Sequence, residues 1–147
     1  MKRIMINSEL CTACMNCVVA CMAEHNEKSK SMYLVNLVDK SNASRNHIVL
    51  GKNNKPIPIF CRHCDEPECV NTCMSGAMTK DEESGIVKYD KVKCASCYMC
   101  IMSCPFGVLK PDDMSGDTIV KCDFCDNREV PRCVENCPVG AIYVQEV

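Results

Sequence analysis

The sequence predicts a small α+β fold in which short strands and short helices form two interleaved units. Its 147 residues suffice for one compact domain or two small ones. The chain contains 16 Cys, and they fall into four groups of four along the sequence. Large aromatic side chains are scarce, with 0 Trp, 3 Phe and 4 Tyr. We therefore expect groups other than side chains to fill much of the interior.

The four groups of cysteines are variants of one motif. The first, CTACMNCVVAC, and the third, CASCYMCIMSC, share the spacing C-x2-C-x2-C-x3-C. The second, CRHCDEPECVNTC, and the fourth, CDFCDNREVPRCVENC, keep C-x2-C at the front and C-x3-C at the back. In both, the intervening loop is longer and a Pro (Pro67, Pro131) stands two positions before the third cysteine.

The C-x2-C-x2-C-x3-C spacing is that of the bacterial ferredoxin loop, which binds a [4Fe-4S] cube. A loop with two residues between thiolates can wrap three corners of one cube. The fourth cysteine lies at the start of the next helix and points away, and in two-cluster proteins it completes the other cube. The sequence therefore predicts four [4Fe-4S] clusters, with iron bound by all sixteen cysteines.

Two other uses of so many cysteines are disfavoured. A disulfide framework needs an oxidising compartment, whereas the first residues, MKRIMINSEL, contain no apolar run typical of a signal peptide. We expect a cytoplasmic protein with reduced thiols that bind metal. Structural zinc sites draw on two separated cysteine pairs, whereas the first and third motifs crowd four cysteines into one loop and helix start. The sequence thus favours iron over zinc.

Short β-prone runs are predicted around the motifs. Residues 3–7, RIMIN, form a strand before the first motif. Residues 33–38, YLVNLV, and 57–60, IPIF, are predicted strands, and GKNNKP between them has turn chemistry. The polar stretch 39–47, DKSNASRNH, is expected to be an exposed loop, with docking of a partner as its alternative role.

Similar signals follow the second and fourth motifs. After the second, a hairpin is predicted with a turn at Ser84 and Gly85 before IVKYD. After the fourth, residues 141–144, AIYV, form a last strand placed like the outer strand of a second unit. A short helix is expected within each cysteine motif.

These elements predict two interleaved two-cluster ferredoxin-like units. The inner unit covers residues 61–104, and the outer unit combines residues 1–21 with 105–147. Residues 22–60 connect them and hold a strand pair. Two tandem units are the alternative, but residues 22–60 are too long and polar for the short connection that a tandem unit would use.

The exchange of the fourth cysteine then assigns the ligands. The four predicted quartets are Cys11, Cys14, Cys17 and Cys137 (quartet 1); Cys21, Cys122, Cys125 and Cys133 (quartet 2); Cys61, Cys64, Cys69 and Cys104 (quartet 3); Cys73, Cys94, Cys97 and Cys100 (quartet 4).

In their order, the stretches CTACMNCVVAC, FCRHCDEPECVNTC, CASCYMCIMSCPFG and CDFCDNREVPRCVENCPVGAI resemble the four-cluster electron-transfer subunits of molybdopterin oxidoreductases. Similar small proteins accompany formate dehydrogenases, hydrogenases and nickel carbon monoxide dehydrogenases. The resemblance covers nearly the whole chain and implies the same pairing, first motif with fourth and second with third. The chain departs from the family in carrying Met22 and Met74 where Pro is common, and this leaves ligation unaffected because Pro binds no iron.

The resemblance implies a chain that passes electrons singly and performs no catalysis itself. Its expected partners are a larger catalytic subunit of the carbon monoxide dehydrogenase, formate dehydrogenase or hydrogenase type, with a flavin-dependent oxidoreductase as a further candidate. The alternative is a free, soluble polyferredoxin that carries electrons. No GxGxxG, P-loop, GxSxG or HExxH motif supports an active site.

Membrane insertion and nucleic-acid binding have no support in the sequence. No apolar run approaches the about 18 residues that a membrane-spanning helix requires. The formal net charge is −2, and Lys and Arg form no basic block. Four bound cubes with their thiolates would move the net charge to roughly −10.

Three residues beside the cysteines have two possible roles each. His63 is expected to pack or to hydrogen-bond near a cluster rather than to ligate iron, because cysteines supply every ligand position. Lys93 and Lys121 each precede the first cysteine of a motif. Each is either a charge that raises the potential of a cluster or an ordinary surface lysine.

Overall fold

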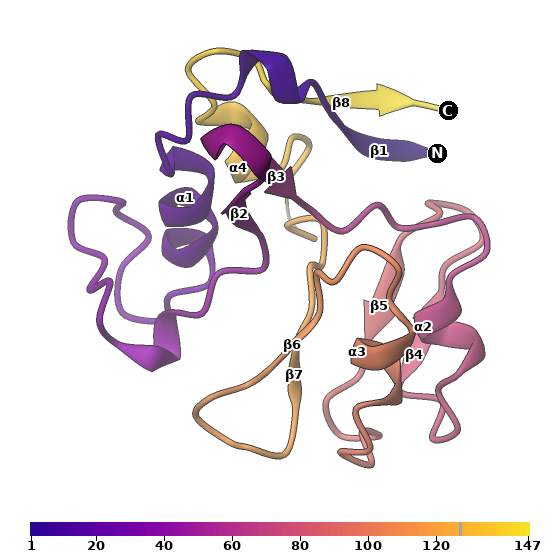
Figure 1. The fold of residues 1–147 in the computed structure, drawn as a ribbon. Helices are drawn as coiled ribbons and strands as arrows, with labels where there is room; N and C mark the ends of the chain where they lie inside the picture. The colour runs from indigo at the N-terminus through magenta and orange to yellow at the C-terminus, as the bar shows by residue number, and fades with distance from the viewer. Residues whose placement is uncertain (127) are drawn as a thin grey trace.

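The computed structural model describes residues 1–126 and 128–147 and consists of four short helices and four antiparallel strand pairs (Figure 1). The helices are α1 (Asn16–Glu24), α2 (Glu68–Asn71), α3 (Met99–Ser103) and α4 (Arg132–Glu135). The strands are β1 (Lys2–Ile6), β2 (His47–Leu50), β3 (Pro56–Ile59), β4 (Met78–Lys80), β5 (Val87–Tyr89), β6 (Lys110–Pro111), β7 (Ile119–Val120) and β8 (Ile142–Glu146). Single 3-10 turns cover Ser8–Leu10, Lys40–Asn42 and Lys52–Asn54. The predicted α+β class is confirmed.

The first and last strands of the chain pair with each other. β1 runs antiparallel to β8, with Ile6 opposite Ile142 and Lys2 opposite Glu146, so the two chain ends lie side by side (Figure 1). Beneath this pair, α1 contacts α4. One buried cluster fills this half of the molecule and consists of Ile4, Cys17, Phe60, Phe124, Cys133 and Ile142.

The second half is built around the β4–β5 hairpin, which lies with α2 and α3 (Figure 1). Asp81 caps its turn by accepting hydrogen bonds from the N–H groups of Glu83 and Ser84, at 3.1 and 2.9 Å. Gly85 has a φ of +75°, a left-handed conformation that suits glycine. The buried cluster of this half consists of Cys61, Met78, Val87, Cys100, Val108, Leu109 and Ile119.

The strand predicted at residues 33–38 is wrong. The segment between α1 and β3 holds a strand pair, but the partner of β3 is β2. Residues 33–38 form turns instead, and the Asn36 side chain accepts the N–H of Val38 at 3.0 Å. This local bond competes with strand pairing, and Tyr33 and Val38 are 98% and 88% exposed. The apolar composition of residues 33–38 predicted a strand, but no strand of the described residues pairs with this segment.

The expectation of an exposed loop at residues 39–47 is wrong in part, although Lys40 and Ser41 are exposed. Asn42, Ser44 and Asn46 are buried. The Asn46 side chain donates to the carbonyl of Cys17 at 3.3 Å, and the backbone N–H of Arg45 donates to Cys21 Sγ at 3.2 Å. These polar side chains are buried because they satisfy backbone and sulfur groups of the first cysteine motif.

Within the described residues, the longest helix is α1 with 9 residues, so no helix there is long enough to cross a membrane.

Candidate metal centres

The cysteines of three predicted quartets line three separate cavities. The first cavity is lined by Cys11, Cys14, Cys17 and Cys137, the second by Cys21, Cys122, Cys125 and Cys133, and the third by Cys61, Cys64, Cys69 and Cys104. Each therefore combines three cysteines of one motif with the fourth cysteine of another. The structure brings these residues together in the predicted groups, and their ligation of iron stays a prediction.

The cysteines of quartet 4 gather around α3. Cys100 lies in the buried cluster of the second half of the molecule, and Cys73 packs against that cluster. Burial raises the pKa of Cys100, and the nearby thiols of Cys73 and Cys94 raise it further. Cys97, the remaining member, is exposed.

The thiols of a quartet affect one another electrostatically. Burial raises the pKa of Cys17 to about 11, and Cys14, Cys137 and Cys11 contribute to the increase. Burial likewise raises the pKa of Cys69 to about 11, with contributions from Cys61, Cys104 and Cys64. Like-charge repulsion of this kind acts only over short distances. For Cys17 and Cys69, the thiols that raise the pKa are thus members of the same predicted quartet.

This donor set fits a metal that binds thiolates. All sixteen cysteines are free thiols, so no disulfide competes for them. Without a metal, thiols with a pKa of about 11 stay protonated at neutral pH, and burial of several together as thiolates is unfavourable. Bound iron would supply the compensating positive charge, and the cysteines of each quartet would hold it as thiolates after losing their protons.

The backbone of all four motifs bends at the same position. The residue before the second cysteine of each motif has a positive φ, at 55° for Ala13, 44° for His63, 55° for Ser96 and 59° for Phe124. None of these residues is Gly, so each carries conformational strain. Alternation of right- and left-handed residues turns successive N–H groups toward a common centre, an arrangement suited to binding anionic groups. The sequence did not predict this repeated bend, because the four residues at this position differ in type and none of them is Gly.

His63 is buried and neutral. Its Nδ1 accepts the N–H of Val87 at 3.0 Å, and its ring meets the edge of Phe124 with the centroids 5.6 Å apart. Burial and then the charge of Lys121 lower the pKa of His63 to about 3. It lines the cavity of quartet 3, and its Nε2 has no hydrogen-bond partner in the described part of the chain. This agrees with a packing and hydrogen-bonding role.

Lys93 and Lys121 differ although both precede a first cysteine. Lys93 is exposed and lies 3.6 Å from Asp90. Lys121 is only 6% exposed, and its Nζ donates to Cys61 Sγ at 3.3 Å, to the carbonyl of Val87 at 3.1 Å and to that of Cys122 at 2.7 Å. Lys121 therefore lies between quartet 2 and quartet 3.

An ion pair beside quartet 2 was missed from the sequence. His25 Nε2 lies 3.0 Å from an Asp123 carboxylate oxygen, and its Nδ1 lies 2.8 Å from the carbonyl of Cys21. Burial opposes the charged ring, but hydrogen bonds with Asp123 and Cys21 outweigh it and raise the pKa of His25 to about 9. The sequence positions of these two residues could have indicated the pair, because each lies beside a cysteine of quartet 2. His25 follows Cys21 by one helical turn, and Asp123 follows Cys122 directly.

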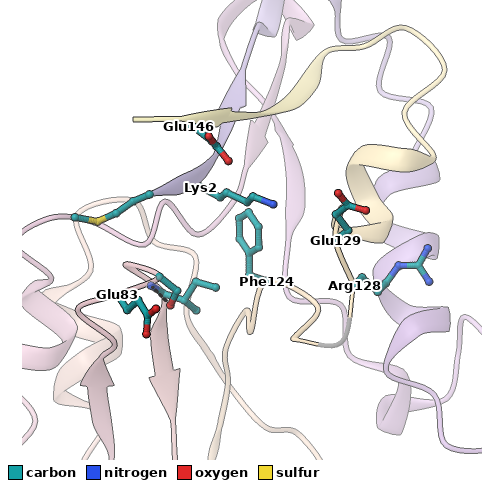
Figure 2. A pocket seen from close by; sticks show the side chains of 9 residues that line it. Lys2, Glu83, Phe124, Arg128, Glu129 and Glu146 are labelled. Carbon is teal, nitrogen blue, oxygen red and sulfur yellow. Dashed lines mark hydrogen bonds between the residues drawn. The ribbon is translucent and has the colours of Figure 1, made fainter.

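A larger open cavity of about 400 Å³ lies apart from the quartets (Figure 2). It is lined, among others, by Lys2 of β1, by Glu83 of the β4–β5 turn, and by Phe124, Arg128 and Glu129. Figure 2 shows Phe124 facing Lys2 across this space. None of the described residues that line it is a cysteine, and Phe124 separates it from the cavity of quartet 2, which Phe124 also lines.

Short antiparallel strand pairs around clustered cysteines define a ferredoxin-like iron-sulfur protein. Comparison with protein-family models agrees, because two models described as 4Fe-4S dicluster domains match residues 54–147 and 10–92. The chain belongs to the 4Fe-4S dicluster domain family.

Several proteins of known sequence are similar to nearly the whole chain. The putative oxidoreductase AegA of Escherichia coli K12 is 32% identical over 96% of this chain and 21% of its own length. The hydrogenase-2 operon protein HybA of E. coli O157:H7 is 32% identical over 95% of this chain and 50% of its own length. The electron transport protein HydN of E. coli K12 is 29% identical, covering 95% and 85%. The chain thus spans half or less of the first two proteins.

Among solved structures, the active site complex BamBC of benzoyl coenzyme A reductase as isolated contains a similar chain. The two are 29% identical, with a TM-score of 0.56 over 99% of this chain and 76% of that one.

Proposed function

We propose that this chain binds four [4Fe-4S] clusters and transfers electrons between a catalytic redox subunit and a second redox partner. The ligands are the four quartets defined above, and each bound cluster would accept and release one electron. The observation that carries the proposal is the succession of quartets through the molecule, in which cysteines of neighbouring quartets share a buried cluster or influence each other electrostatically.

Contacts between quartets support a linear order. Cys17 of quartet 1 and Cys133 of quartet 2 lie in one buried cluster. Burial raises the pKa of Cys122 in quartet 2, and the nearby thiol of Cys61 in quartet 3 raises it further. Cys61 and Cys100 of quartet 4 belong to the second buried cluster. These contacts support electron transfer through the quartets in the order 1, 2, 3, 4, because neighbouring quartets in this order lie close together.

The two ends of this order are open to the surface. Cys14 of quartet 1 and Cys97 of quartet 4 are the exposed cysteines among the sixteen. Exposed apolar side chains adjoin both ends: Met15 follows Cys14, and Met74 follows Cys73 of quartet 4. Surfaces of this kind suit contact with another protein. They support entry of an electron at one end and exit at the other.

The proposed division into units follows the same contacts. Pairing of β1 with β8 and of α1 with α4 supports an outer unit of residues 1–21 and 105–147. Pairing of β4 with β5 and contact of α2 with α3 support an inner unit of residues 61–104. Residues 22–60 then connect the two. A cytoplasmic location remains part of the proposal and is supported by the free thiols.

The catalytic partner is proposed to be of the hydrogenase, formate dehydrogenase or carbon monoxide dehydrogenase type, with a flavin-dependent oxidoreductase as a possible second partner. The names of similar proteins support the broad class: one is a hydrogenase-2 operon protein, another a subunit of NADH-dependent phenylglyoxylate dehydrogenase, and a third a chain of the BamBC complex. Catalysis is assigned to the partner.

Anaerobic purification from the native host tests both parts of the proposal. Iron and acid-labile sulfide should each approach about sixteen atoms per chain, because each cube holds four of each. A colourless, zinc-containing protein would overturn cluster binding. A catalytic subunit should co-purify, and recovery of the chain alone, with its iron, would favour a free polyferredoxin.

A further inference from the structure

We propose that Lys121 is a positioning residue whose buried ammonium group raises the reduction potential of the cluster at quartet 3. The inference rests on the proposed binding of [4Fe-4S] clusters. Reduction adds one electron, and therefore one negative charge, to that site. A fixed positive charge nearby favours the reduced form.

The ammonium group of Lys121 is held by three hydrogen bonds. An ammonium group has three N–H donors, and Nζ has three acceptors: Cys61 Sγ, the carbonyl of Val87 and the carbonyl of Cys122. The acceptors come from the second motif, from β5 and from the fourth motif. Every donor is thus used, and the charge has a fixed position.

The negative charge that balances Lys121 must come from the cysteines. A buried charge is costly unless an opposite charge compensates it. None of the three acceptors of Nζ is a carboxylate, and one of them is the sulfur of a quartet member. Quartet 3 with its iron supplies the missing counter-charge.

The effect should be greater on quartet 3 than on quartet 2. Nζ contacts the Sγ of Cys61 directly, whereas it contacts only the backbone carbonyl of Cys122. Hydrogen bonds and positive charges at ligand sulfurs are among the factors that set cluster potentials. Lys121 thereby gives quartet 3 a potential different from that of its neighbours.

Lys93 provides a matched control. It occupies the same position in the third motif, directly before Cys94, but it is exposed and its Nζ lies 3.6 Å from the Asp90 carboxylate. Water and that carboxylate screen its charge. Its removal should leave the cluster potentials unchanged.

The test compares anaerobic holoprotein of the wild type with Lys121→Met, Lys121→Gln, Lys121→Arg and Lys93→Met. Iron and sulfide are measured first, so that wild-type protein without iron refutes the proposed function rather than this inference. Each protein is then titrated with dithionite as the electron donor, and the midpoint potentials are followed by electron paramagnetic resonance and visible absorbance.

We expect Lys121→Met and Lys121→Gln to lower one midpoint potential, and Lys121→Arg to keep it near the wild-type value. Lys93→Met should change none. Fully loaded Lys121→Met with all potentials unchanged would overturn the inference. Loss of iron from both uncharged variants would also overturn it, because Lys121 would then be needed for cluster assembly rather than for the potential.

Discussion

At the residue scale, side chains other than cysteine determine how the motifs are held. His63 is the clearest example, because it accepts the N–H of Val87 from a position between two cysteines. Its ring also contacts Phe124, which directly precedes Cys125 in the fourth motif. One buried histidine therefore links the second motif, the hairpin and the fourth motif.

Replacement of His63 should destabilise the protein. His63→Leu leaves the buried N–H of Val87 without an acceptor, which costs about 1–3 kcal/mol. We expect faster loss of visible absorbance in guanidinium chloride than for the wild type. His63→Asn retains a side-chain acceptor and tolerates the positive φ, so its effect should be smaller. Glu82→Gln, at an exposed position of the hairpin turn, is the control. Equal rates for His63→Leu and this control would contradict the prediction.

At the scale of elements, polar residues decide which segments become ordered. Asn46 anchors the connecting segment on α1 through the carbonyl of Cys17, and Asp81 closes the β4–β5 turn. Residues 33–38 are likewise held by a side chain, because Asn42 donates to the carbonyl of Asn36 at 2.8 Å, but they form turns rather than a strand. The ordered elements of this protein are thus short and are fixed by side-chain hydrogen bonds to the backbone.

Loss of the Asn46 anchor should weaken the packing around α1. Asn46→Ala removes the donor to the Cys17 carbonyl, and the loss of this hydrogen bond costs about 0.5–1.5 kcal/mol. The expected result is faster exchange of α1 amide hydrogens in native protein. Asn71→Ala, at an exposed position of α2, should leave α1 exchange at the wild-type rate. Unchanged protection of α1 in Asn46→Ala would show that the anchor is dispensable.

Asp81 should stabilise the hairpin without pH dependence near neutrality. Hydrogen bonds from the N–H of Ser84 and from Lys88 lower the pKa of Asp81 to about 2, from an ordinary value of 3.8. For a carboxyl with a lowered pKa, the stabilisation is complete above the unfolded value and is lost as pH falls through the folded value. Asp81→Ala should therefore speed amide exchange in β4 and β5 by the same factor across the neutral range. A factor that varies with neutral pH would implicate a different group.

At the scale of the whole molecule, the two halves meet where quartet 2 faces quartet 3. Lys121, His63 and Phe124 lie at this junction, and Asp65 of the second motif also pairs with Arg3 of β1. Electrostatic contacts therefore join halves whose bound clusters would repel each other. The expected net charge of roughly −10 with four clusters makes such contacts important.

Substitution of single cysteines should reveal the exchange between motifs. Cys14→Ser and Cys137→Ser, from motifs far apart in sequence, should alter the same cluster signal in electron paramagnetic resonance, because both line the cavity of quartet 1. Cys73→Ser should alter a different signal. If Cys14→Ser and Cys73→Ser instead shared a signal, the first and second motifs would pair in tandem and the proposed units would be wrong.

The sequence by itself determined the family and the α+β class, because ligation of a compact cube restricts the loop that surrounds it to few lengths. The assignment of the sixteen cysteines to four quartets stays a prediction. The sequence also placed the outer strands, since β1 and β8 follow from their positions beside the first and fourth motifs. The tertiary structure alone decided which of two equivalent lysines is buried, that three polar residues of the segment 39–47 are buried, and that His25 pairs with Asp123. These outcomes depend on neighbours that are distant in sequence, and the free energy of burying a polar group is set by those neighbours rather than by the group itself.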